Sequence, residues 1–268
     1  MYRRSTAGRS RPRLLHLSVA CLSAIACSGA FASSALADVT EVTGSAFGES
    51  VDVQLLNTVP VNSGPLPSVN MASPPGGLGP FSQSVLSASV PGVLSAGVLN
   101  ASTQGGNLGS HAGFATSSAS VANLNALANR VTATVIGSTC RSNGDGSTGS
   151  STLTNLNVLG VAVNAATAPN TTINLPGIGR VIINEQIRPT NGPTDTSIIV
   201  RAIHVELDGL LGSGDIIIAE SRCGAKGPDV VPVAPIGLLG VTALLGLGFA
   251  GMQWKNRRDG RSVAASTH

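Results

Sequence analysis

The sequence is poor in aromatic side chains, and this shortage narrows the ligands that the protein could bind. Its single tryptophan and single tyrosine lie near the two ends, so the segment from Asp38 to Pro235 has only Phe47, Phe81 and Phe114. Proteins that bind sugars or single-stranded nucleic acids stack these ligands on flat aromatic rings. The composition therefore argues against a classical lectin, a carbohydrase or a nucleic-acid-binding protein.

Groups that could serve in catalysis are also scarce. Between the two apolar ends the histidines are His111 and His204, and the sequence has no Gly-x-Ser-x-Gly elbow, Walker loop or His-Glu-x-x-His motif. Ser110 precedes His111 and could be a nucleophile beside a base, although neighbours in sequence rarely align for attack. His204 shares a strand face with Glu206, which predicts a charged, solvent-facing surface. We expect a protein that is not an enzyme and has no cofactor.

Charged residues are few in the middle of the chain, and basic residues gather at its ends. From Asp38 to Asp229 there are seven basic and twelve acidic residues, although the whole chain has a net charge of +3. Cations beside apolar segments mark the cytoplasmic side of a membrane. The positive net charge therefore does not indicate a nucleic-acid partner.

The N-terminus has the three parts of a secretory signal peptide. A stretch with five arginines is followed by an apolar run from Leu14 to about Phe31 and then by small residues. Ala35-Leu36-Ala37 fits the small-x-small rule, so residues 1–37 are predicted to be a signal peptide cleaved between Ala37 and Asp38. The alternative is an uncleaved signal anchor.

A second apolar run, Pro235 to Trp254, contains no charged residue. Its twenty residues would form a helix of about 30 Å, which matches the hydrocarbon core of a bilayer. Trp254 lies where an interfacial aromatic residue belongs, and a basic tail follows it, with Lys255, Arg257 and Arg258. The run predicts one C-terminal transmembrane helix whose partner is membrane lipid; the alternative is a buried core helix.

These two segments predict the domain organisation. Both have their positive charge on the side of the chain terminus, so the middle of the chain is expected at the cell surface. The boundaries are a signal peptide at 1–37, an extracellular domain at 38–225, a tether at 226–234, a transmembrane helix at 235–254 and a cytoplasmic tail at 255–268.

The cysteines agree with an exported domain. Once the signal peptide is removed only Cys140 and Cys223 remain, and each follows a strand-like run. An oxidising compartment would allow them to form one disulfide. The alternative is two free thiols.

The exported segment has the pattern of β-structure. Turn signals such as Asn143-Gly144-Asp145-Gly146, Pro176-Gly177 and Asp208-Gly209 separate β-branched or alternating runs. These runs are 50–56, 131–136, 181–187, 197–207 and 215–219. We expect an all-β, sandwich-like or layered domain, with residues 57–80 forming a Pro/Gly-rich loop or edge. An Asn-Leu-Asn-x-Leu pattern repeats 32 residues apart, at 123–127 and 155–159, which suggests equivalent strands in two layers.

Calcium is the metal that we considered. The stretch 143–147 resembles the middle of a calcium loop, but Arg141 and Thr152 stand where two of the ligands would be, so we expect a hairpin turn. A surface calcium site could still be assembled by the fold from the acidic residues Glu49, Asp52, Glu206, Asp208, Asp215 and Glu220.

Several stretches, in their order along the chain, resemble the choice-of-anchor P family of bacterial surface proteins. They are Gly44-Ser45-Ala46-Phe47-Gly48, the loop from Pro65 to Gly77, 149–156, 169–172, 179–186 and 200–205. The resemblance implies an extracellular β-rich domain with a variable C-terminal anchor, and it implies no catalytic residues. The tail is similar to sorting signals for wall attachment, but Val231-Pro232-Val233-Ala234-Pro235 lacks the Leu-Pro-x-Thr-Gly and Pro-Glu-Pro motifs. A retained membrane anchor is therefore the simpler interpretation.

The leading hypothesis is a non-catalytic, membrane-anchored surface protein with a structural or adhesive role. The alternatives are a module that binds calcium or a small ligand and a hydrolase centred on Ser110 and His111.

Overall fold

The computed structural model describes residues 38–55, 60–189, 192 and 194–228. The predicted signal peptide, transmembrane segment and basic tail, with most of the predicted tether, lie outside these residues. The predicted cleavage site falls at their border, because Asp38 is the first described residue. In the described part of the chain, no helix is long and apolar enough to cross a membrane.

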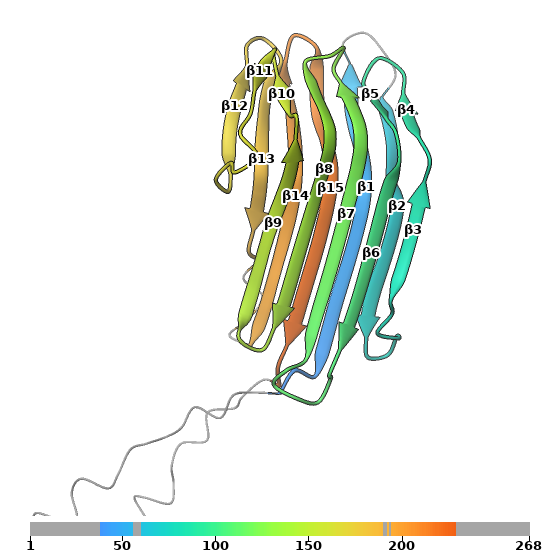
Figure 1. Cartoon of the computed structure of the whole chain (residues 1–268), viewed down its shortest axis with the longest axis vertical. Helices are drawn as coiled ribbons and strands as arrows, with labels where there is room; N and C mark the ends of the chain where they lie inside the picture. The colour runs from blue at the N-terminus through green and yellow to red at the C-terminus, as the bar shows by residue number, and fades with distance from the viewer. Residues whose placement is uncertain (1–37, 56–59, 190–191, 193, 229–268) are drawn as a thin grey trace, which may run out of the picture. The chain divides into compact units, whose positions relative to one another are not determined.

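The described residues form fifteen strands and no helix, which confirms the predicted all-β fold. Six strands make one antiparallel sheet, in which the first and last strands of the domain are neighbours (Figure 1). Its order is β12 (Thr171–Leu175), β13 (Gly179–Ile187), β14 (Asp195–Gly209), β15 (Gly212–Lys226), β1 (Glu41–Leu55) and β2 (Val61–Ser73).

The other nine strands make the second antiparallel sheet. Five strands form its body, in the order β9 (Gly146–Thr154), β8 (Val131–Asn143), β7 (Phe114–Ala126), β6 (Leu99–Gly106) and β3 (Phe81–Val85). Short strands extend it at one end of β7 and β8: β4 (Ala88–Val90), β5 (Leu94–Ala96), β10 (Asn157–Val158) and β11 (Val161–Ala162).

The two sheets pack against each other through one face each. The main core contains alternate residues of both sheets, such as Val121 and Ile136 from the nine-stranded sheet and Val205 and Ile216 from the six-stranded sheet. Because side chains alternate between the two faces of a strand, every second residue is left on an outer face. The sandwich therefore has two outer faces, one for each sheet.

An irregularity in the six-stranded sheet changes which residues face outward. Between β14 and β15 the register passes from Ile203 opposite Ile218 to Arg201 opposite Glu220, and it omits Ala202 and Ala219. Ala219 has a φ of 52°, in the left-handed region. Ala202 and Ile203 are both fully buried, so the alternation changes phase between them. Arg201 and His204 consequently lie on the same outer face.

This phase change corrects one sequence inference. The pattern 197–207 predicts a strand with Ile199, Ile203, Val205 and Leu207 on one face, broken only by Arg201. The strand exists, as β14, but Ile199 is half-buried on the outer side while Ile198 and Val200 belong to the core. A ladder irregularity leaves no signal in the hydrophobic pattern.

The Pro/Gly-rich segment 57–80 contains the edge strand β2, which fits the prediction of an edge. Pro65 and Pro67 lie within this strand. Proline has no backbone N–H to donate, and it is tolerated in an edge strand because no further strand needs that donor.

The repeated Asn-Leu-Asn-x-Leu pattern corresponds to repeated backbone geometry, but not to two layers. Asn123 and Asn155 have φ angles of 50° and 52°, and Leu127 and Leu159 have 52° and 53°. The first copy ends β7 and the second follows β9, and both strands pair with β8 in the same sheet. The prediction of equivalent strands in two layers is therefore wrong.

Candidate functional site

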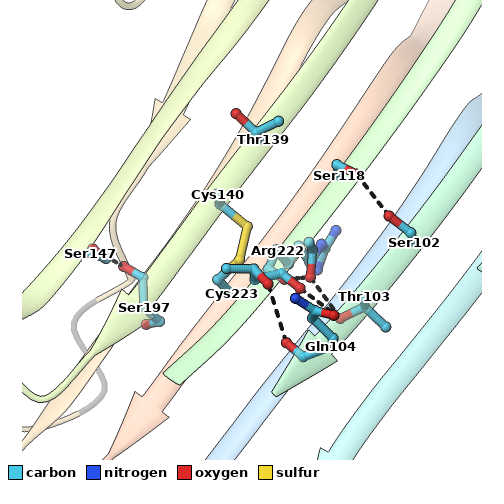
Figure 2. Close-up of a disulfide and its surroundings, with 12 residues drawn as sticks. Ser102, Thr103, Gln104, Ser118, Thr139, Cys140, Ser147, Ser197, Arg222 and Cys223 are labelled. Carbon is cyan, nitrogen blue, oxygen red and sulfur yellow. Dashed lines mark hydrogen bonds between the residues drawn. A yellow bond between two sulfur atoms is a disulfide. The ribbon is translucent and has the colours of Figure 1, made fainter. Parts of the chain in front are cut away.

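A disulfide joins the two sheets, as the sequence predicts. Cys140 of β8 and Cys223 of β15 are bonded with a Cα–Cα distance of 5.9 Å (Figure 2). Both residues are buried in a second apolar cluster, with Val42, Met71 and Ile198. The bridge closes a separation of 83 residues, so it stabilises the fold by about 4–5 kcal/mol if it acts through the entropy of the unfolded chain.

Polar contacts beside the disulfide also connect the sheets. Ser117 Oγ of β7 donates to the carbonyl oxygen of Arg222 in β15 at 2.9 Å, and lies 2.8 Å from the hydroxyl of Thr103 in β6. These buried hydroxyls therefore have hydrogen-bond partners, as interior polar groups require.

The outer face of the six-stranded sheet carries a cluster of ionisable side chains that contact one another. We call it the charged face and define it by Arg180, Glu185, Arg201, His204, Glu206, Asp215, Glu220 and Arg222. These residues come from three adjacent strands, β13, β14 and β15.

Glu220 is at the centre of this face. Its side chain is completely buried, and Arg201 Nε donates to its Oε2 at 2.7 Å. Arg222 Nε donates to its other oxygen, Oε1. Arg201 also donates from Nη1 to Glu185 Oε2 at 3.0 Å. A buried carboxylate needs such partners to offset its loss of hydration, so the two arginines hold Glu220 in its place.

His204 lies between two carboxylates. Nδ1 is 3.0 Å from Glu185 Oε2 and Nε2 is 3.0 Å from Asp215 Oδ1. Burial by itself lowers the pKa of His204, but the hydrogen bonds to Glu185 and Asp215 outweigh it and raise this pKa above the ordinary 6.5. The arrangement favours an imidazolium that donates a proton from each nitrogen.

The same contacts act in the opposite direction on Glu185. Burial raises the pKa of this carboxyl, but the hydrogen bond and charge of His204, together with Arg201, outweigh it, so the pKa lies below 4.5. The sequence correctly places His204 on the face of Glu206. The predicted solvent exposure is wrong, because His204 is only 6% exposed under its neighbours.

The six acidic residues considered for calcium do not form one site. Glu206, Asp215 and Asp52 are opposite one another on β14, β15 and β1, but Glu206 pairs with Arg180 and Asp215 with His204. Across the described ranges, no group of three His, Cys, Asp or Glu side chains could hold a metal ion. The stretch 143–147 is a hairpin turn between β8 and β9, as expected, with Asn143 Oδ1 accepting from the amides of Asp145 and Gly146.

Ser110 and His111 lie in the loop between β6 and β7. Ser110 Oγ donates to the carbonyl oxygen of Asn107 at 2.7 Å. His111 Nε2 lies 2.7 Å from Asp145 Oδ1 in the β8–β9 turn. The serine hydroxyl is therefore engaged with the backbone of its own loop, while the histidine ties that loop to the hairpin.

The outer face of the nine-stranded sheet has a different chemistry. One row of directly opposite residues crosses all five long strands, and each member carries a hydroxyl group: Ser82, Ser102, Ser118, Thr139 and Ser150. The next row is Ser84, Asn100, Ser120, Gly137 and Thr152. We call these two rows the hydroxyl face.

Hydrogen bonds link neighbours within the rows. The hydroxyls of Ser102 and Ser118 are 2.8 Å apart (Figure 2), and those of Thr139 and Ser150 are 3.0 Å apart. In the second row Ser84 donates to Asn100 Oδ1 at 2.7 Å, and Asn100 donates to Ser120 at 3.2 Å. The rows are thus ordered before any ligand binds.

The hydroxyl face is hollowed by two open depressions of about 460 and 440 Å³. Ser102, Ser118 and Thr139 line both of them, so the two depressions adjoin. A third depression of about 500 Å³ lies over the six-stranded sheet, next to Arg222 and Thr43. Together the two adjoining depressions of the hydroxyl face therefore have the larger volume.

Sequence reasoning missed the roles of these surfaces for different reasons. An arginine inside the apolar run 197–207 was a visible sign of a buried ion pair, since an arginine is rarely buried without a partner. The hydroxyl rows had a weaker sign, the alternate Ser and Thr residues of 114–120 and 146–154. Their alignment depends on the register of five strands.

Comparisons with known proteins add little to this description. No protein-family model matches the chain, and no curated protein matches it. The resemblance to the choice-of-anchor P family therefore stays a prediction. A solved structure with a weak likeness is the crystal structure of Ail, the attachment invasion locus protein of Yersinia pestis. The match has 10% identity, covers 70% of this chain and 98% of that chain, and has a TM-score of 0.15, which is too low to carry an argument.

Proposed function

We propose that this protein is exported, is displayed at the cell surface on a C-terminal membrane anchor, and has a structural or adhesive role without catalysis. The disulfide between Cys140 and Cys223 is the observation that carries the proposal, because such bonds persist in oxidising compartments outside the cytosol. The predicted signal peptide and the basic residues after Trp254 support the same topology.

The positions of the two histidines support a role without catalysis. A general base needs a ring nitrogen that can take a proton from a substrate. Both nitrogens of His204 face carboxylates, and Nε2 of His111 faces Asp145. The Ser110 hydroxyl donates to the carbonyl oxygen of Asn107 in its own loop. These groups act in holding strands and loops together.

The charged face and the disulfide support a structural role. Long antiparallel strands, an inter-sheet bridge and a buried arginine–glutamate network all resist opening of the sandwich. The hydroxyl face is left for contact with a partner.

The intact mass of the full-length protein purified from its own cells under non-reducing conditions tests this proposal. We expect the mass of a chain that begins at Asp38, retains residues 229–268 and lacks the two thiol hydrogens lost on disulfide formation. A mass that retains residues 1–37 with two free thiols would contradict export to an oxidising compartment.

A further inference from the structure

We infer that the hydroxyl face binds an uncharged, hydroxyl-rich polymer, a neutral polysaccharide chain that lies in the two joined depressions. The inference rests on the proposed adhesive function and names the class of partner. Its starting point is the juxtaposition of ten residues from five strands, eight of which carry a hydroxyl group.

The charge of the surface selects an uncharged partner. Within β3, β6, β7, β8 and β9 the only charged residue is Arg141, which lies over the ring of Phe114 at 4.2 Å, beyond the two rows. The cluster of ion pairs lies on the other outer face, that of the six-stranded sheet. An anionic polymer would find no cluster of cations on the hydroxyl face, and a cationic one would find no carboxylates.

The hydrogen-bonding capacity of the surface selects a partner with hydroxyl groups. A serine or threonine hydroxyl has one donor and two acceptor sites, so a single bond to its neighbour leaves capacity for a ligand. Asn100 adds an amide to the array. A surface that can donate and accept at all of its ten positions except Gly137 matches a ligand whose groups do the same.

The extent of the surface selects a chain over a single sugar. Five strands at the usual spacing cover about 19 Å from the first to the last. Gly137 has no side chain, and it lies in the row between Ser120 and Thr152, where it contributes to the hollow. A surface of this extent can contact several units of a polymer.

The two rows contain no aromatic residue, so a sugar ligand would need many contacts at once to bind there. Without a stacking platform, each sugar unit would be held only by hydrogen bonds that compete with water, and each of these contributes little. Several such contacts made together by one chain, and by many copies of the protein on one cell, can give useful binding.

Binding of the full-length, detergent-solubilised protein to insoluble polysaccharides tests the inference. The neutral matrices are cellulose, chitin, starch and cross-linked dextran, and the anionic matrices are alginate and pectate. The test variant combines Ser102→Ala, Ser118→Ala and Thr139→Val, which removes hydroxyl groups and leaves the hollow open. The control combines Ser50→Ala, Ser68→Ala and Thr43→Val on the six-stranded sheet, and thermal unfolding verifies that both variants fold.

We expect at least one neutral matrix to retain the wild-type protein, with little change at raised salt. The test variant should bind it about tenfold more weakly, because three hydrogen-bonding groups are lost, and the control should bind like the wild type. Failure of every neutral matrix to retain the protein, equal retention of the test variant, or salt-sensitive retention on anionic matrices alone would each overturn the inference. The intact-mass measurement does not depend on these outcomes, so export can stand when polysaccharide binding fails.

Discussion

Arg201 and Glu220 lie opposite each other on β14 and β15, and the 2.7 Å hydrogen bond between them holds a carboxylate that has no contact with solvent. The arginine is itself only 17% exposed and also pairs with Glu185. The pair therefore connects three strands, with β13 contributing Glu185, at the level where the strand ladder is irregular.

Replacing Arg201 should destabilise the domain strongly. Arg201→Met leaves the buried Glu220 carboxylate with Arg222 as its remaining cation, and breaking a buried pair in this way costs about 3 kcal/mol or more. Denaturant unfolding measures the change.

The matched control for Arg201 is Arg180→Met, on the same face. Arg180 pairs with Glu206, and its side chain is half exposed, so we expect a loss below about 1 kcal/mol. Equal losses in the two variants would contradict the central role of Arg201.

The stability of the domain should decrease as the pH rises above 6.5, the ordinary pKa of histidine. The folded state raises the pKa of His204 above 6.5, so the stabilisation from its charged form is complete below pH 6.5 and is lost as the pH rises through the folded value. The groups that face this ring are Glu185, Asp215, Glu206 and Arg201. Unfolding free energies of the wild type and His204→Gln between pH 5.5 and 9 should converge at the alkaline end. A constant difference would show that protonation of His204 is unimportant.

Acid should also destabilise the domain, because it protonates the Glu185 carboxylate that contacts His204 and Arg201. The pKa of Glu185 is below 4.5 in the folded state, so its contribution is present above pH 4.5 and is lost as the pH falls through the folded value. Glu185→Gln should remove this part of the acid sensitivity in the same unfolding measurements. If Glu185→Gln and the wild type lose the same stability at low pH, other carboxyl groups cause the loss.

Glu49 should behave in the opposite way to Glu185. Its side chain is fully buried, Ser63 donates to Oε1 at 2.9 Å, and within the described residues Oε2 has no hydrogen-bond partner. Burial raises the pKa of this carboxyl above 4.5 despite the bond from Ser63. The wild type should therefore lose stability as the pH rises through that pKa. The difference in unfolding free energy between Glu49→Gln and the wild type should favour the variant by about 1–3 kcal/mol more at pH 8 than at pH 4. A difference that does not depend on pH would contradict this prediction.

The disulfide should account for a large part of the stability. Reduction, or the double substitution Cys140→Ala and Cys223→Ala, should lower the unfolding free energy by about 4–5 kcal/mol. Reductant should change the wild type and leave the double variant unchanged, which separates the effect of the bridge from other effects of the reagent. A wild type that is insensitive to full reduction would contradict this prediction.

The sequence predicted the parts of the fold that depend on local pattern. Alternating runs in the sequence predicted β1, β8, β13, β14 and β15. The predicted runs are shorter than these strands, because Gly and Ser residues at the strand ends are weak strand signals. The pairing of Cys140 with Cys223 was also predictable, since no other cysteine lies between the predicted signal peptide and the C-terminus.

Features that depend on cross-strand register could not be predicted from the sequence. The phase change at Ala202, which brings Arg201 and His204 together, follows from the ladder between β14 and β15. Equally, the row that contains Ser118 and Thr139 exists only because five strands are aligned. A single sequence contains the residues of such a surface but not their neighbours.

The two lysines of the chain, Lys226 and Lys255, provide the most direct test of surface display. Lys226 is exposed at the end of β15, and Lys255 follows the predicted membrane segment. Intact cells would be treated with an amine reagent that cannot cross membranes, and the labelled peptides would be identified by mass spectrometry. We expect labelling of Lys226 in intact cells and labelling of Lys255 only after lysis. A Lys226 that is protected in intact cells and reacts only after lysis would contradict it.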